Sequence, residues 1–348
     1  MKRLVSALLA TVICLSSLFT LASCERVRTK SWTEGYFDTK SIMSFYSYIS
    51  SKRFDRAVEY VEGELQKYDK LFDFYFEYSG INNVKTINKN AGKSAVTVDP
   101  ELFDFLVWCK EMFTLTDGVT NIAMGSVLKK WHDFRDSAPE FGMEAEDDLP
   151  AAEVLADAAL HADIDLLELN AEDLSVYISD SRCSLDVGAV AKGYATERIA
   201  RGLVEMGYTS FALNIGGNLR CIGTRPGGDE WSVGITNPDK SSMEPFVTTV
   251  SVSDTSLVTS GNYERYVTKD GKSYHHLIDP ATNFPATHFS SVTVIIPDSG
   301  LADALSTAFF CSSMEDAQAL FDRLVPTYPD LKVVLVSTDF KQVTTLER

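Results

Sequence analysis

The sequence predicts an α+β protein whose mixed or antiparallel sheets are flanked by helices. Short segments of strand-like composition follow one another between Trp231 and Ile278 without a helical pattern among them. A regular alternation of strands and helices, which would indicate a parallel sheet, is not seen. With 348 residues, of which 45% are hydrophobic, the chain can bury a large core in one elaborate domain or in two intimate lobes.

The N-terminal half is expected to contain several helices after an opening pair of strands. Aromatic and β-branched residues predict the strand pair over 36–49. Apolar residues from Phe54 to Tyr68 recur at helical spacing, which predicts a helix over 52–71. Further helices are predicted over 100–113, 122–131 and 151–160, and strands over 166–169 and 174–178. The acidic, proline-bounded segment 136–150 indicates an exposed insertion.

The C-terminal half is expected to be richer in strands. A helix begins within 185–197 and continues to about Met206. Strands are predicted over 211–215, 231–235, 247–252, 256–259, 274–278, 292–296 and 332–336. Two helices are predicted between the last strands, over 301–310 and 315–324.

The segment Leu185 to Glu197 is the most informative run of the sequence. It joins Asp186, a glycine- and alanine-rich bend, and the start of a helix that carries Lys192. Backbone N–H groups approach an anion closely where side chains are small, and a starting helix adds a favourable dipole. The run therefore indicates a phosphate site, in which Asp186 holds a ribose hydroxyl or helps to position a metal. Packing at an ordinary strand-to-helix turn would give a similar pattern, so that alternative stays open.

Three further features carry chemistry. Asp303 and Thr307 are four residues apart on a predicted helix, so their oxygens share one face and suit Mg²⁺, unless they only cap and face the helix. His275 and His276 are adjacent, and a histidine with a pKa near ~6.5 can accept a proton at neutral pH. The aromatic cluster over 72–78 is explained by core packing or by ligand stacking.

The N-terminus has the pattern of a bacterial lipoprotein signal. Lys2 and Arg3 precede an apolar run that ends at Leu21-Ala22-Ser23-Cys24. We expect residues 1–23 to be removed and Cys24 to carry acyl chains such as palmitate, followed by a tether over 24–35 and one domain over 36–348. A plain secretory signal or an uncleaved anchor is the alternative. The expected location is the extracytoplasmic face of the bacterial cell membrane.

Net charge and cysteines narrow the functional classes. The net charge is −17 and becomes −19 once Lys2 and Arg3 are removed, which argues against nucleic acid or an anionic membrane surface as a partner. An acidic protein that binds a pyrophosphate needs a local cation. Beyond Cys14 and Cys24, four cysteines lack metal-ligand spacing and are expected to be buried free thiols, although an extracytoplasmic location permits a disulfide.

The ordered motifs resemble those of the FAD:protein FMN transferase family, the ApbE flavin transferases. The motifs that carry the resemblance, besides 185–197, are Thr116-Asp117-Gly118, Asn214-Ile215-Gly216-Gly217-Asn218, Thr259-Ser260-Gly261-Asn262-Tyr263, His276-Leu277-Ile278-Asp279-Pro280-Ala281-Thr282 and Ala302-Asp303-Ala304-Leu305-Ser306-Thr307. The chain departs from the family in two places, at residues 119–121 and at Asn283. Val119, Thr120 and Asn121 stand where a small residue and Phe-Asp are usual, which puts the role of Asn121 in doubt, and Asn283 replaces a glycine.

The resemblance implies a T-fold-like flavin-transferase architecture and a set of site residues. It implies His276 as general base, and Ala189 (backbone carbonyl), Asp303 and Thr307 as Mg²⁺ ligands. Residues implied to bind FAD are Phe37, Tyr75, Val119, Thr120, Asn121, Asp186, Lys192, Gly216, Gly217, Ser260, Gly261, Tyr263, Leu277, Asp279 and Thr282.

The implied reaction is attack by a threonine hydroxyl of an acceptor protein on the flavin-side phosphorus of FAD. FMN becomes attached through a phosphoester and AMP leaves, with Mg²⁺ and Lys192 neutralising the pyrophosphate. The family's expected acceptors are membrane-anchored subunits of Nqr- or Rnf-type redox complexes. Three alternatives stay open: a lipoprotein that only binds FAD, an enzyme that hydrolyses FAD to FMN and AMP, and a solute-binding lipoprotein.

Overall fold

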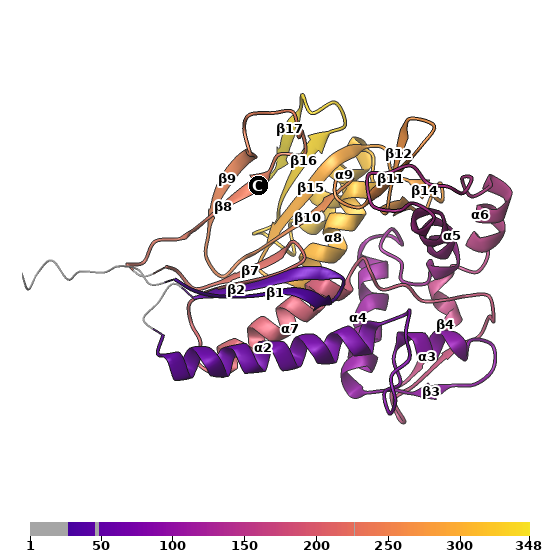
Figure 1. The fold of residues 1–348 in the computed structure, drawn as a ribbon, viewed down its shortest axis with the longest axis horizontal. Coiled ribbons are helices and arrows are strands. Elements are labelled where there is room, and N and C mark those ends of the chain that lie inside the picture. Colours follow the sequence, from indigo (N-terminus) through magenta and orange to yellow (C-terminus); the bar gives the residue numbers. More distant parts are fainter. Residues whose placement is uncertain (1–26, 46–48, 226) are drawn as a thin grey trace, which may run out of the picture.

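The computed structural model describes residues 27–45, 49–225 and 227–348 (Figure 1). The predicted signal peptide over 1–23 and the predicted lipidation site Cys24 lie outside the described residues.

An eight-stranded sheet forms the centre of the fold. Its strand order is β1-β2-β6-β7-β10-β15-β16-β17, and every neighbouring pair is antiparallel. The strands are β1 Arg28–Tyr36, β2 Thr39–Phe45, β6 Phe211–Ile215, β7 Asn218–Ile222, β10 Ser256–Gly261, β15 Phe289–Ile296, β16 Lys332–Ser337 and β17 Val343–Leu346. The α+β prediction with antiparallel sheets is therefore confirmed.

The two faces of this sheet are covered differently. Along β7 and β10, Ile222 and Val258 join the main core, whereas their neighbours Cys221 and Leu257 join a smaller core on the opposite face. The main core also holds residues of α2 (Ser51–Phe72), α7 (Ala191–Glu205), α8 (Ser299–Cys311) and α9 (Met314–Leu324). The smaller core is closed by the hairpin of β8 (Trp231–Thr236) and β9 (Phe246–Val252), so the sheet lies between a helical layer and a hairpin.

A second region lies beside the sheet, at the right of Figure 1. It contains α3 (Val84–Lys89), α4 (Pro100–Leu115), α5 (Gly125–Asp136), α6 (Ala152–Ala159), the 3₁₀ turn η1 (Ile164–Leu166), and the small sheet of β3 (Val96–Thr97), β5 (Ser175–Ile178) and β4 (Leu167–Asn170). A separate core joins α5 and α6 to the hairpins β11 (Tyr266–Lys269)–β12 (Lys272–His275) and β13 (Ile278–Asp279)–β14 (Phe284–Pro285).

The first strand begins earlier than the sequence predicted. Residues from Arg28 onward form β1, and Trp32 is buried between this strand and the core, so the predicted tether over 24–35 is wrong for its second part. The alternation of Thr29, Ser31 and Thr33 around Trp32 is a strand pattern, and the polar composition concealed it.

Three other boundaries differ from the prediction. The asparagine-rich segment contains α3, which starts with a capping box made by Asn83 and Thr86. The helix predicted over 122–131 starts at Gly125 and continues to Asp136. The single strand predicted over 274–278 is divided, because Leu277 donates its N–H to the ring of His275, 3.2 Å away, instead of continuing the β12 ladder.

The turn between β1 and β2 consists of Phe37 and Asp38. Both have positive φ, 53° and 47°, as a two-residue type I′ hairpin turn requires. Phe37 N–H donates to Asp69 Oδ1 at 2.7 Å, and Asp38 C=O accepts from Arg265 Nη2 at 2.9 Å. The turn is thus fixed from α2 on one side and from the β10–β11 connection on the other.

The cysteines of the described region agree with the prediction. Cys109, Cys183, Cys221 and Cys311 are buried free thiols, and burial raises the pKa of Cys183 and of Cys221 to about 12.

Within the part of the chain that the structure describes, no helix is long and apolar enough to cross a membrane.

Candidate functional site

The first turn of α7 contacts α8 at Asp303. Gly193 N–H donates to Asp303 Oδ2 at 2.8 Å, and the Asp303 side chain is only 5% exposed. A Cβ atom on Gly193 would lie 2.3 Å from Asp303 Cβ and 2.5 Å from Ser299 O. Only glycine lets the two helices approach this closely, so the glycine after Lys192 is a packing requirement as well as a possible phosphate contact.

Asp303 has the properties of a ligand for a hard cation. Burial raises the pKa of its carboxyl, and the charge of Lys192 and the Gly193 N–H oppose that rise. Among the described residues, no hydrogen bond engages Asp303 Oδ1 or the hydroxyl of Thr307, which lies one turn later on α8. Two unengaged oxygens on one helix face fit Mg²⁺, which prefers oxygen ligands.

The remaining predicted ligand, Ala189, is half-buried and lies two residues before α7 begins. The described residues hold no group of three or more His, Cys, Asp or Glu side chains that could bind a metal. The predicted set contains only one such side chain, so the magnesium prediction stays a prediction.

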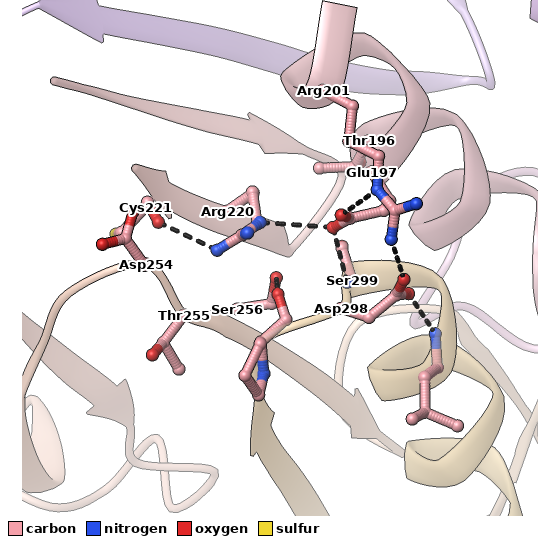
Figure 2. Close-up of polar contacts among 12 residues, drawn as sticks. Thr196, Glu197, Arg201, Arg220, Cys221, Asp254, Thr255, Ser256, Asp298 and Ser299 are labelled. Carbon is pink, nitrogen blue, oxygen red and sulfur yellow. Dashed lines mark hydrogen bonds and ion pairs between the residues drawn. The ribbon is translucent and has the colours of Figure 1, made fainter. Parts of the chain in front are cut away.

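A network of charges fixes α7 to α8 beneath this contact (Figure 2). Glu197 on α7 accepts from Arg201 Nε at 2.7 Å and from Ser299 N–H at 3.0 Å, and it lies 3.2 Å from Arg220 Nε on β7. Arg201 also donates to Asp298 at 2.8 Å, and Asp298 caps α8. Each charge in this network has an opposite partner, and the network fixes the middle of α7 to the start of α8.

The loop after α4 packs against α8. Thr120 Oγ1 donates to Ala304 C=O at 2.7 Å, and Asn121 Nδ2 donates to Ala162 C=O at 2.7 Å while its Oδ1 accepts from Ala123 N–H at 2.8 Å. The side chains of Thr120 and Asn121 are therefore engaged within the protein, and Val119 is half-buried beside them. Asn121 thus shapes this loop through its amide, and its contact with a ligand stays a prediction.

Asp186 connects the loop over 185–190, called the signature loop below, to the aromatic side chains of His132 and Tyr75. Its Oδ1 accepts from Gly188 N–H at 2.9 Å, and its backbone N–H donates to Ile122 C=O at 2.8 Å. Asp186 Oδ2 lies 3.4 Å from Nε2 of His132 on α5, and His132 Nδ1 lies 2.9 Å from the hydroxyl of Tyr75. Lys192 Nζ meanwhile donates to Gly188 C=O at 3.1 Å, so the loop and the predicted cation are close together.

The two adjacent histidines have different environments. His275 is buried, and both ring nitrogens are used: Nε2 lies 2.9 Å from Ala286 C=O, and Nδ1 accepts from Leu277 N–H. Burial lowers the pKa of His275 to about 4. Among the described residues, the ring of His276 has one hydrogen-bond partner, Arg265 C=O, 3.3 Å from Nδ1. Since a carbonyl only accepts, Nδ1 of the neutral ring carries the proton and Nε2 keeps a lone pair.

Cations surround His276. Its pKa lies well below the ordinary value, first because it is buried and then because of the positive charges of Arg135, Arg265 and Lys192. Among the described residues, no ion pair joins Arg135, Arg265 or Lys192 to a carboxylate. The ring is thus neutral at neutral pH and lies among positive charges that have no carboxylate within ion-pair distance in the described residues. Asp186 and Asp303 act on Arg135 and Lys192, respectively, only through longer-range electrostatics.

The other predicted residues lie on loops and strand ends around this group. Asp279 accepts from Ala281 N–H at 2.8 Å and from Thr282 Oγ1 at 3.4 Å, which orders the loop after Leu277. Asn283 adopts φ 60°, as predicted for a residue that replaces glycine. Ser260 bonds to Ser306 of α8 at 2.8 Å.

Tyr263 and the pair Gly216 and Gly217 have contacts outside the group around His276. Tyr263 is contacted by Gly261 and by Lys240, whose Nζ lies 4.6 Å from the ring centroid. Gly216 and Gly217 both have positive φ in the β6–β7 turn, and Gly216 N–H donates to Lys40 C=O, two residues beyond Asp38. Phe37 is tied to the site through Asp38 and Arg265.

The sequence did not reveal His132, Arg135 or Arg265 as site residues. His132 and Arg135 are three residues apart on α5, so they share one helix face. The predicted helix ended at Trp131, one residue before His132, so this face was not recognised. Arg265 follows the predicted Tyr263 motif by two residues, but nothing in the sequence brings it to His276.

The sequence and the fold are both similar to those of known proteins. The model of the ApbE family matches residues 37–331. The chain is 32% identical to an FAD:protein FMN transferase of Treponema pallidum over 85% of this chain and 82% of the relative, and 30% identical to one of Klebsiella pneumoniae over 69% and 74%. The fold is similar to the crystal structure of the ApbE protein from Thermotoga maritima, with a TM-score of 0.77, 24% identity and coverage of 92% and 97%.

Proposed function

Because the chain belongs to the ApbE family and is a transferase, we propose that it moves FMN from FAD to a threonine hydroxyl of an acceptor protein. The new bond joins the threonine oxygen to the flavin-side phosphorus, the pyrophosphate bond breaks, and AMP leaves. The observation that carries this proposal is His276, a neutral histidine whose Nε2 has no hydrogen-bond partner among the described residues and which lies near the charges of Arg135, Arg265 and Lys192.

His276 is the proposed general base. Its Nε2 lone pair accepts the threonine proton, while Arg265 C=O holds the ring through Nδ1–H. Burial and neighbouring cations keep the ring neutral before the reaction, so it does not need to lose a proton first. The proton taken up in the reaction adds charge to a cationic region, which a bound diphosphate would offset.

Asp303 and Thr307, with the carbonyl of Ala189, are the groups proposed to hold Mg²⁺. When bound there, Mg²⁺ would supply positive charge to the pyrophosphate and to the leaving AMP. Lys192 would add to this charge from the protein itself, whereas the N–H groups of Ala191, Gly193 and Tyr194 at the start of α7 are engaged within the protein.

For flavin binding we propose the aromatic ring of Tyr75, which is 48% exposed although it is held by His132. Phe37, Leu277, Asp279 and Thr282 belong to loops that are fixed next to His276, and they are the proposed surroundings of the remaining flavin. A planar heteroaromatic ligand stacks on such an exposed ring.

We further propose that the protein is a lipoprotein, attached through Cys24 to the extracytoplasmic face of the membrane, with a membrane-anchored Nqr- or Rnf-type redox subunit as acceptor. Cys24→Ala is expected to move the protein from the membrane fraction to the soluble fraction while FMN transfer to a soluble acceptor persists. A variant that stays in the membrane fraction would contradict this attachment.

The proposed reaction is tested with purified protein, FAD, Mg²⁺ and a soluble acceptor domain of such a redox subunit, beside the same acceptor with its threonine changed to alanine. Flavin fluorescence that stays on the denatured acceptor, with one AMP released per flavin attached, supports transfer. Free FMN and AMP without labelled acceptor would identify an FAD hydrolase instead. Neither product would identify a protein that only binds FAD.

The metal is tested in the same assay. A chelator should stop transfer, and added Mg²⁺ should restore it. Outer-shell partners of a metal are typically worth about 10- to 100-fold in metal affinity, so loss of a charged ligand in Asp303→Asn should weaken Mg²⁺ activation by at least about 100-fold. Thr307→Ala should do less, and excess Mg²⁺ should partly restore it. Transfer at full rate in the chelator would refute the magnesium site.

A further inference from the structure

Three side chains from distant parts of the sequence form one chain of contacts. The hydroxyl of Tyr75, on the loop after α2, lies 2.9 Å from His132 Nδ1. His132 Nε2 lies 3.4 Å from Asp186 Oδ2 on the signature loop. The polarity is consistent along the chain, because the phenol donates to Nδ1 and the proton on Nε2 faces the carboxylate.

The backbone around Tyr75 is fixed independently of its ring. Asp73 Oδ1 accepts the N–H of Tyr75 at 2.6 Å and that of Phe76 at 3.0 Å. The Tyr75 ring itself is half exposed and has Phe74 as a close aromatic neighbour, with centroids 4.4 Å apart. The hydrogen bond to His132 is therefore what fixes the phenol end of a ring that packing leaves free on one side.

His132 is itself held firmly. It lies in the middle of α5, its side chain is 17% exposed, and it lies nearly parallel to Tyr75, with an interplanar angle of 27°. At its other nitrogen, Asp186 has one oxygen committed to Gly188 N–H, so the oxygen facing His132 is its second. His132 thus contacts both the exposed aromatic ring and the loop that leads into α7.

We propose that His132 is a positioning residue for flavin recognition, which sets the Tyr75 ring against the Asp186 loop before the ligand arrives. The inference rests on the proposed function, because it takes Tyr75 as the ring on which the flavin stacks. Preorganisation of this kind lowers the ordering cost of binding, so its loss appears mainly in affinity.

The test compares His132→Ala, His132→Asn and Tyr75→Phe, with Lys129→Ala on the exposed side of α5 as the matched control. A net hydrogen bond corresponds to a change of roughly 3- to 10-fold, so His132→Ala should raise the Kd and KM for FAD by that factor and leave kcat nearly unchanged. The melting temperature of His132→Ala should fall, because its side chain is only 17% exposed, whereas that of Tyr75→Phe, which loses only a hydroxyl, should stay nearly unchanged. His132→Asn, whose amide can replace the Nδ1 contact, should restore part of the affinity. Binding of ADP, which lacks the flavin, should be unaffected.

A double-mutant cycle makes the test specific. If His132 acts through the Tyr75 hydroxyl, the Kd of the His132→Ala/Tyr75→Phe double variant should equal that of the more affected single variant. Multiplying effects, equal losses for FAD and ADP, or a melting temperature of Tyr75→Phe that falls with its affinity would overturn the inference and leave His132 a structural residue. Wild-type protein that does not bind FAD would instead refute the proposed function.

Discussion

Charged side chains gather in two regions of this molecule, and they are paired in only one of them. Between α7, α8 and β7, Glu197 and Asp298 have arginine partners at 2.7–3.2 Å, and Glu197 also accepts a backbone N–H (Figure 2). Around His276, the described residues give Arg135, Arg265 and Lys192 no carboxylate partner.

The difference separates architecture from ligand binding. A buried charge is costly unless it is paired, so a completed network is explained by the fold alone. Cations gathered without partners raise the cost of folding, and an anionic ligand would remove that cost. The paired region is therefore expected to govern stability and the unpaired region to govern binding and catalysis, which the following variants can separate.

The largest effect is expected at His276 in the unpaired region. His276→Ala should lower the transfer rate by roughly 10²- to 10⁴-fold with FAD affinity nearly unchanged, because only the proton acceptor is lost. The pKa of His276 is lowered, so the neutral form persists below pH 6.5 and the wild-type rate should begin to fall only at lower pH. Stopped-flow or initial-rate transfer assays over pH check this, and a full-rate His276→Ala protein would refute it.

The next effect belongs to the paired region. Glu197→Ala leaves Arg220, whose side chain is 11% exposed, without its carboxylate, and breaking a buried pair costs about 3–5 kcal/mol of unfolding free energy. Arg201→Ala is the control in the same network, since its side chain is 58% exposed and surface pairs are worth about 0–1 kcal/mol. Denaturant unfolding of both variants decides whether the network stabilises the fold.

Burial of neutral His275, next to His276, should make the free energy of unfolding depend on pH. Its pKa is about 4 in the folded protein against an ordinary value of 6.5, so between these values the unfolded chain binds more protons. Its contribution is complete above pH 6.5 and is lost as the pH falls toward 4, by about 3 kcal/mol. In His275→Gln, which cannot titrate, unfolding free energy should decline less over this range. Identical slopes would contradict the buried neutral ring.

The smallest effect is expected for the unpaired guanidinium. Arg135→Gln should weaken FAD binding by roughly tenfold, the lower range for a hydrogen bond to a charged group, and leave stability unchanged or slightly higher because no ion pair is broken. Isothermal titration with FAD and thermal unfolding measure the two quantities. A loss of stability without a loss of affinity would place Arg135 with the paired region.

Local sequence signals predicted most of the fold, and contacts made by non-local pairing were hidden. Helix α2 and helix α9 have strong apolar periodicity, and their observed bounds differ from the predicted ones by one residue at each end or less. Strand β1 was taken for a tether because Arg28, Lys30 and its two threonines look like linker composition, and only pairing with β2 makes Trp32 a core residue. Strand β17 was likewise not predicted, because its position depends on pairing with β16.

The candidate site divides in the same way. Lys192, Asp303 and His276 lie within ordered motifs, and the structure brings the charge of Lys192 close to both others. The family pattern suggested Asn121 as a ligand contact, whereas the fold uses its amide to hold a loop. His132 and Arg265 join segments far apart in the sequence, so only the tertiary structure reveals them.

The β1–β2 turn holds a residue that is unfavourable for its backbone conformation. A type I′ turn favours Asn-Gly, yet Phe37 and Asp38 occupy both positive-φ positions, where a bulky aromatic is an outlier that costs about 1–3 kcal/mol. Selection for thermal stability alone would therefore replace Phe37 first. A chain that keeps the phenylalanine retains an aromatic ring that packs against the main core at the expense of an easier hairpin. Consensus or directed-evolution campaigns on this scaffold should hold that turn constant, because a stabilising substitution at Phe37 would change a residue proposed to surround the flavin, next to Asp38, which holds Arg265.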